Sequence, residues 1–135
     1  MNKKLEYGIL GLLYLASESD KVASVREIAA QSNIPEALLS KVMQSMKNVG
    51  LVSSVHGNHG GYRLNRSLDK INLLELTQVL VGPVHVTECL EPGNESCRAK
   101  PSCTIIAPMS LLNQRIMSLF EETSLDTLAA RKASL

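Results

Sequence analysis

The sequence predicts a mostly α-helical protein that carries one small β-hairpin and a long helix near its C-terminal end. Three patterns lead to this expectation: two short amphipathic segments joined by a tight turn, an alternating segment folded about a glycine-rich turn, and a heptad of apolar residues. With 135 residues, 44% of them hydrophobic, the chain can bury one core of ordinary size and still carry an extension.

The first helix is expected over residues 5–15, where apolar residues recur at helical spacing. Its expected inner face consists of Leu5, Ile9, Leu12, Leu13 and Ala16. Residues 17–23 are expected to form a polar connection. Ser24 and Glu27 then have the spacing of a capping box, which satisfies backbone N–H groups at the start of a helix. This second helix is expected to end near Gln31.

A third helix is expected over residues 36–48, between a break at residues 32–35 and Gly50. Pro35 suits the first turn, because the N–H group that proline lacks has no helical partner there. The expected apolar side consists of Leu38, Leu39, Val42, Met43 and Met46. Residues 51–55 and 62–64 alternate like strands around the glycine-rich residues 56–61. Two short helices followed directly by a hairpin predict a winged helix-turn-helix head.

This architecture places the second helix of the pair in the major groove of DNA and the hairpin, the wing, along the backbone or minor groove. Glutamine can pair with adenine edges, and lysine with guanine or phosphate. The candidate DNA-binding residues are therefore Ser40, Lys41, Gln44 and Lys47 on the helix and His56, Asn58, His59 and Arg63 on the wing. For each single residue, an ordinary solvated side chain is the alternative. Residues 1–70 carry nine basic and six acidic residues, a mild bias that favours a polyanionic partner.

A fourth helix is expected over residues 69–81, packed on the first, and residues 83–103 are expected to form a loop. All three cysteines of the chain, Cys89, Cys97 and Cys103, lie in this loop. A loop can gather thiols around a metal centre because its backbone bends freely, and an odd number of cysteines fits poorly with a disulfide framework. No stretch reaches the ~18 to 20 apolar residues of a membrane span. We therefore expect a cytoplasmic protein without a membrane partner, in which metal thiolates are favoured over disulfides.

The longest helix is expected over residues 104–122, with Pro108 in its first turn. Its apolar residues are spaced alternately by four and three positions, which is a heptad seam: Ile105, Met109, Leu112, Ile116 and Leu119. The seam can pack on the head or form a dimer interface, and the apolar faces already present in the head favour a homodimer. The chain then divides into a DNA-binding domain (1–82), a cysteine loop (83–103) and a dimerisation helix with a C-terminal tail (104–135).

Several segments resemble the IscR/NsrR/RirA-type iron–sulfur regulators, which are dimeric bacterial winged-helix transcription factors. The resemblance lies in residues 6–7, 25–29, 50–54, 60–64 and 71–79, together with the three-cysteine loop. It implies a homodimer that binds a palindromic promoter site in double-stranded DNA and carries an iron–sulfur cluster, [4Fe–4S] or [2Fe–2S]. The expected function is that of a transcriptional regulator, most simply a repressor, that senses iron, nitric oxide or redox state.

The resemblance also implies a ligand set, in which Cys89, Cys97 and Cys103 hold the cluster and one iron position stays open. In relatives, an acidic residue near the start of the first helix can ligate the cluster of the partner subunit, and Glu6 occupies this place. The local alternatives are His85, Glu88 and Glu91. For Glu6 itself, the alternative is an ordinary acid that stabilises a helix N-terminus. The chain departs from some members at Ile106, where they carry a histidine ligand, and from several at His56, where they carry arginine.

Other functions fit the residues less well. His85 and the three cysteines would make a Cys3His zinc set, but the closely spaced pairs of the usual zinc motifs are absent. A metal-free winged-helix regulator that responds by cysteine oxidation or through a partner protein is a further alternative. An enzyme is not expected, since no Ser/His/Asp set or carboxylate pair is seen to converge and no phosphate-binding loop is present.

Overall fold

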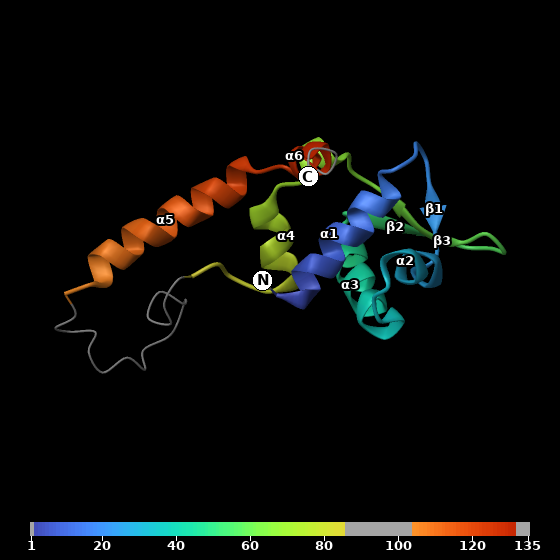
Figure 1. The fold of residues 1–135 in the computed structure, drawn as a ribbon, viewed down its shortest axis with the longest axis horizontal. Helices are drawn as coiled ribbons and strands as arrows, with labels where there is room; N and C mark the ends of the chain where they lie inside the picture. The colour runs from blue at the N-terminus through green and yellow to red at the C-terminus, as the bar shows by residue number, and fades with distance from the viewer. Residues whose placement is uncertain (1, 86–103, 132–135) are drawn as a thin grey trace.

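The computed structural model describes residues 2–85 and 104–131. In chain order the elements are α1 (Lys3–Leu15), β1 (Val22–Ala23), α2 (Val25–Ser32), α3 (Glu36–Asn48), β2 (Val52–Val55), β3 (Gly61–Leu64), the short 3-10 helix η1 (Leu68–Lys70), α4 (Leu73–Leu80), α5 (Ile106–Glu122) and α6 (Leu125–Arg131). The expected fold class is confirmed, because helices dominate and a small sheet holds the hairpin (Figure 1). Within the described ranges, no helix is long and apolar enough to cross a membrane.

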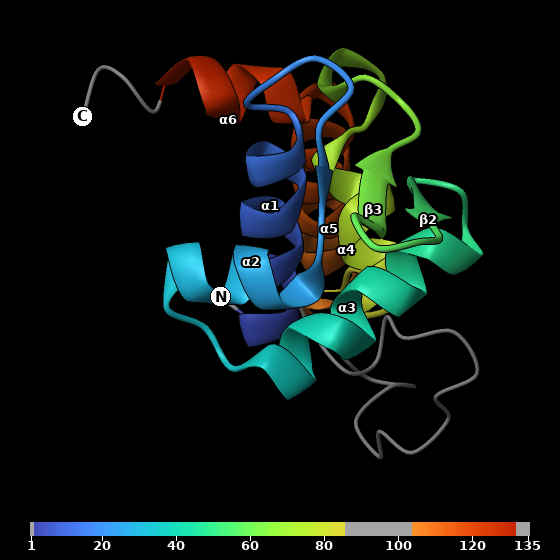
Figure 2. The ribbon, with the colours of Figure 1, turned by 90° about the vertical axis from the view of Figure 1, so that its right-hand side faces the viewer.

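Helix α1 lies at the centre of the head and contacts α2, α3, α4, α6 and β3 (Figure 2). Leu12 and Leu15 of α1 are at most 1% exposed. Gly8 and Gly11 let the neighbouring helices pack directly against the backbone of α1. A Cβ atom at Gly8 would lie 2.4 Å from Cδ1 of Leu80, and one at Gly11 would lie 3.1 Å from Sδ of Met43. The expected contact between the fourth helix and the first is therefore confirmed, and it depends on a missing side chain.

The inner face of α1 differs in part from the expected one. Leu5 and Leu12 are buried as expected, and Ile9 and Leu13 pack partly against the core. Ala16, expected to face inward, is exposed just beyond the end of the helix. The glycines that occupy the buried face carry no apolar side chain, so hydrophobic spacing could not reveal them.

The sheet is three-stranded and antiparallel in the order β1-β3-β2. Strands β2 and β3 form the expected wing, with Val52 opposite Leu64 and Val55 opposite Gly61. Strand β1 lies within the segment expected to be a polar connection, so that expectation is wrong at residues 22–23. A strand of two residues is too short to show a period of two, and its pairing with β3 is a long-range contact.

At Gly61, the backbones of β3 and β1 leave no room for a side chain. A Cβ atom there would lie 2.3 Å from the carbonyl oxygen of Ala23, and the backbone φ is +154°. We expect Gly61→Ala to lower the free energy of unfolding by about 1–3 kcal/mol, because a backbone atom must move to admit the methyl group. Chemical denaturation followed by circular dichroism measures this change.

Gly57→Ala is the matched control for this substitution. Gly57 also has a positive φ, +118°, but its added Cβ atom would have no neighbour within 4 Å. The control therefore reports backbone strain alone. Equal losses of stability in the two variants would contradict the contact with Ala23 as the cause.

Helices α2 and α3 form the helix-turn-helix as expected. The N–H group of Glu27 donates to Oγ of Ser24 at 3.1 Å, so the side-chain cap is present, and the Ser24 hydroxyl also donates to the Glu27 carboxylate at 3.3 Å. Helix α3 has the expected bounds, although Pro35 stands at its N-cap and not in its first turn. Leu38 is wrong as a member of the buried face, because it is 44% exposed.

The fourth helix is shorter than expected, because Asn72 divides the segment into η1 and α4. The Asn72 side chain accepts from the N–H group of Glu75 at 2.8 Å and so caps α4. The N–H group of Leu73, which no helical carbonyl can satisfy, donates to the carbonyl of Thr123 at 2.8 Å. The start of α4 is thereby joined to the segment between α5 and α6.

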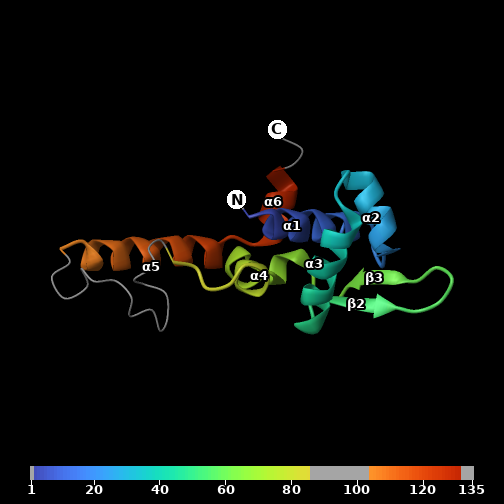
Figure 3. The same cartoon turned by 90° about the horizontal axis from the view of Figure 1, so that it is seen from below.

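Helix α5 extends away from the head, on the side opposite the wing (Figure 3). It begins two residues later than expected and has Pro108 in its first turn. The C-terminal end of α5 meets the head, and Leu125 of the following α6 is fully buried there. At the start of α6, the Ser124 hydroxyl donates to the carboxylate of Asp126. Residues 132–135 of the expected C-terminal tail lie outside the described residues.

Candidate nucleic-acid interface

The outer face of α3 carries the four helix residues that the sequence assigns to DNA. Ser40, Lys41, Gln44 and Lys47 are all exposed. The buried face of the same helix consists of Leu39, Val42, Met43 and Met46. Because this apolar face fixes the helix in the core, the polar face has one orientation toward solvent. A helix that reads a major groove needs this arrangement.

The wing carries the other four assigned residues beside α3. His56, Asn58 and His59 are exposed in its turn, and Arg63 is exposed on β3. The turn is closed by the N–H group of Gly60, which donates to the carbonyl of Gly57 at 3.0 Å. Figure 3 shows the wing projecting from the end of the head that also presents α3. Helix and wing can therefore contact one duplex together.

Tyr62, which the sequence-based assignment omits, connects the wing to α3. Its hydroxyl donates to Oε1 of Gln44 at 3.4 Å, and Nε2 of Gln44 donates to Oδ1 of Asn48 at 3.5 Å. Gln44 retains one lone pair and one N–H group for a base edge. The alternation of residues 62–64 indicates a strand, but it does not indicate which helix Tyr62 faces.

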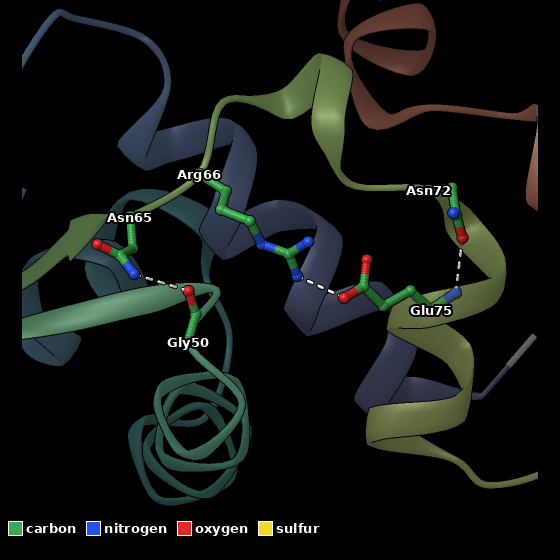
Figure 4. Close-up of polar contacts among 5 residues, drawn as sticks. All are labelled: Gly50, Asn65, Arg66, Asn72 and Glu75. Carbon is green, nitrogen blue, oxygen red and sulfur yellow. Dashed lines mark hydrogen bonds and ion pairs between the residues drawn. The ribbon is translucent and has the colours of Figure 1, made fainter.

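Two residues directly after the wing, also absent from the assignment, anchor it on both sides (Figure 4). Nδ2 of Asn65 donates to the carbonyl of Gly50, at the end of α3, at 2.9 Å. The Arg66 guanidinium forms an ion pair with the Glu75 carboxylate on α4. A polar pair after a strand is an ordinary loop composition, so the sequence contains no signal that separates these residues from their neighbours.

The cysteine loop begins where the head ends. Cys89, Cys97, Cys103, Glu88 and Glu91 lie outside the described residues. In the part of the chain that the structure describes, no three His, Cys, Asp or Glu side chains are grouped as a metal site.

Of the candidate ligands, Glu6 and His85 are described, and both lie near the start of this loop. Glu6 is in the first turn of α1 and pairs with Lys3 at 3.4 Å. Leu80, at the end of α4, packs against Gly8 of α1. The first turns of α1 therefore lie beside the point where the chain leaves α4 for the loop. Nδ1 of His85 lies 3.1 Å from the carbonyl oxygen of Pro83. With Nδ1 as the donor in that bond, Nε2 is the nitrogen left for a metal.

The profile of the Rrf2 family, described as an iron-dependent transcriptional regulator, matches residues 1–131. The chain belongs to the Rrf2 family. Among its relatives, the HTH-type transcriptional regulator NsrR of Oceanobacillus iheyensis is 27% identical over 139 residues, which cover 100% of this chain and 92% of that protein. The resemblance to the IscR/NsrR type of regulator is thereby confirmed.

Solved structures agree with the assignment of this chain to the Rrf2 family. CymR of B. subtilis, titled the global cysteine regulator, has a TM-score of 0.75 at 25% identity, covering 96% of this chain and 95% of its own. T. potens IscR has a TM-score of 0.69 at 22% identity, covering 100% and 90%, and shows the shared fold. The Rrf2 family consists of transcriptional regulators that bind DNA.

Proposed function

We propose that this Rrf2 protein is a homodimeric repressor that binds a palindromic promoter site and senses iron, nitric oxide or redox state through an iron–sulfur cluster. The exposed polar face of α3 beside the wing carries the DNA-binding part of this proposal. In a two-fold dimer, each recognition helix reads one half-site, and the half-sites lie about one helical turn apart. Affinity should fall steeply with salt, since phosphate contacts release bound cations.

The donor set of the cysteine loop supports the cluster. Three thiols within 15 residues of irregular composition suit iron–sulfur ligation, for which thiolate is the usual ligand. Cys89, Cys97 and Cys103 would hold the cluster, which when bound supplies a redox-active and displaceable iron centre. Glu6 is the proposed fourth ligand, given to the partner's cluster. A carboxylate binds iron less firmly than a thiolate, and this weakness suits a sensor.

The position of the cysteine loop suggests how sensing reaches DNA. The loop connects the end of α4, which packs on α1 in the head, to the start of α5. A change in the loop therefore acts on both parts that set the distance between two recognition helices in a dimer. The cluster can change DNA affinity only if its ligation favours one spacing of the two recognition helices over another. The difference in ligation free energy between these two arrangements limits how much the DNA affinity can change.

Anaerobic purification with absorbance spectra and iron and sulfide determination tests the cluster. We expect single Cys→Ala variants at positions 89, 97 and 103 to lose the visible chromophore and to remain folded dimers, because residues of α1–α4, the sheet and α6 already build one continuous core. Ultracentrifugation and circular dichroism check the second part. A variant with full iron and sulfide content would remove that cysteine from the ligand set.

The fourth ligand is tested by comparing Glu6→Ala with His85→Ala after anaerobic reconstitution. We expect Glu6→Ala alone to alter the spectra and to speed cluster loss. Lys3→Ala removes the ion-pair partner of Glu6 and keeps the carboxylate, so it controls for the lost surface pair. Unchanged spectra in Glu6→Ala together with cluster loss in His85→Ala would place the ligand in the loop.

A metal-free regulator is the second candidate, favoured by the likeness to CymR. In that case the three cysteines would respond by oxidation, or the protein would respond to a partner. Anaerobic purification distinguishes the two candidates. A metal-free regulator would be colourless and contain no sulfide, whereas an iron–sulfur protein would be coloured and contain both iron and sulfide. A colourless protein that contains zinc would instead indicate the Cys3His site with His85.

A further inference from the structure

Arg66 and Glu75 join two parts of the molecule that the DNA-binding function must hold in register. Arg66 lies two residues after the wing, and its neighbour Asn65 is bonded twice to the short connection between α3 and β2. The Asn65 side chain donates to the carbonyl of Gly50 at 2.9 Å, and its N–H group donates to the carbonyl of Leu51 at 3.0 Å. Arg66 is therefore fixed to the recognition helix and the wing as one unit.

Glu75 is fixed to the opposite part. Its N–H group is bonded to the capping side chain of Asn72, and Figure 4 shows its carboxylate directed at Arg66. The same turn is joined to the end of α5 by a backbone bridge between Asn72 and Ser124 and by the bond from Leu73 to Thr123. Glu75 therefore moves with the end of the helix that we propose for dimerisation.

The ion pair lies between these two units in a half-buried place. The side chains of Arg66 and Glu75 are each 35% exposed, so water screens their attraction less than that of a surface pair. A guanidinium also fixes direction as well as distance when it binds a carboxylate. The apolar core already packs α3 against α4, so the pair adds a directional contact to an interface whose cohesion does not depend on it.

We propose that Arg66 and Glu75 are positioning residues for DNA recognition, which set the angle of α3 and the wing relative to α5. In a dimer this angle decides the half-site spacing that both recognition helices can reach at once. The inference rests on the proposed dimeric DNA binding and goes beyond it, because it assigns the choice of spacing to residues outside the DNA-contacting set.

The test uses the full-length dimer and an operator selected from random DNA by the wild-type protein, with half-site spacings at the selected length and at one base pair more and less. The readout is the ratio of affinities for the selected and altered spacings. We expect Arg66→Gln and Glu75→Gln each to lower this ratio about tenfold, within the range for residues that modulate coupling between sites. The double variant Arg66→Glu with Glu75→Arg should restore the ratio, because it remakes the pair with reversed charges.

Glu18→Gln is the matched control, since it removes a local ion pair with Lys21 within the segment between α1 and β1, which lines the same surface hollow as Arg66 but does not bridge the two units. It should leave the ratio unchanged. Gln variants that melt at a lower temperature yet keep the wild-type ratio would overturn the proposal and show a purely structural pair. If the Gln variants do not fold, the charge-reversed protein decides the question by its ratio. A wild-type protein that selects no DNA would refute the proposed function instead, so the two failures are distinct.

Discussion

Replacing Lys41 and Gln44 by alanine together is expected to lower operator affinity by about 100-fold or more. Each dimer would lose two lysine contacts and two glutamine contacts, and one bidentate base contact contributes about 1–3 kcal/mol of discrimination. Both side chains are exposed on α3, whose buried face is unchanged, and alanine is the best helix former. The variant should therefore fold like the wild type, although it also loses the bond of 3.4 Å from Tyr62 to Gln44.

Salt dependence separates the two residues. If Lys41 binds a phosphate, Lys41→Ala alone should reduce the steepness of log affinity against log salt by about 2 per dimer. Each lost phosphate contact contributes about 0.9 to this slope, and each subunit loses one contact. Gln44→Ala should leave the slope unchanged and relax the preference for one base pair. Fluorescence anisotropy on labelled operator at several salt concentrations measures both effects.

Lys70→Ala with Gln78→Ala is the matched control, since it removes the same residue types from exposed positions outside α3 and the wing. It should keep wild-type affinity. An unchanged affinity in the Lys41/Gln44 variant would show that the recognition face is assigned wrongly.

Local signals explain why the helix-turn-helix could be predicted closely. The Ser24 cap, the break before Pro35 and the glycine at position 50 bound α2 and α3 without help from distant contacts. The division of residues 69–81 was also readable, because Asn72 followed by Glu75 is a capping signal. That signal lies in a segment whose apolar residues indicate one continuous helix.

Long-range packing explains what the sequence could not indicate. Leu125 is fully buried in the head, although the preceding helix α5 projects out of the head over most of its length. Leu38 has the right spacing for the core but is exposed, because it lies near the start of α3, beside a surface hollow of about 270 Å³ that Lys4 and Leu80 also line. The bonds of Tyr62, Asn65 and Arg66 connect elements whose relative placement depends on the whole fold.

Dimerisation through α5 gives the second large expected effect. No side chain of α5 is buried within the chain. Three members of the predicted heptad seam, spaced by seven residues, are the most open: Ile105 is 55%, Leu112 42% and Leu119 60% exposed. Their neighbours in the seam, Met109 and Ile116, are half-buried. A row of exposed apolar side chains along one helix face favours contact with a second copy of the chain.

We expect Leu112→Asp with Leu119→Asp to convert the dimer into a monomer in sedimentation experiments. Each carboxylate would have to be buried without a partner in a two-fold seam, which costs several kcal/mol. Operator affinity should then fall by about 10²–10⁴-fold, because the second half-site is no longer bound by a tethered subunit. The head should keep its melting behaviour, since both leucines are largely exposed in the single chain.

Gln114→Asp with Ser118→Asp adds the same charge to exposed positions on the other side of α5. This control should stay dimeric and bind operator nearly as the wild type does, apart from a small loss due to the added negative charge. A Leu112/Leu119 variant that remains a dimer would place the interface elsewhere. A variant that becomes monomeric but keeps full operator affinity would show that each head binds DNA alone, so that the spacing of two half-sites carries no part of recognition.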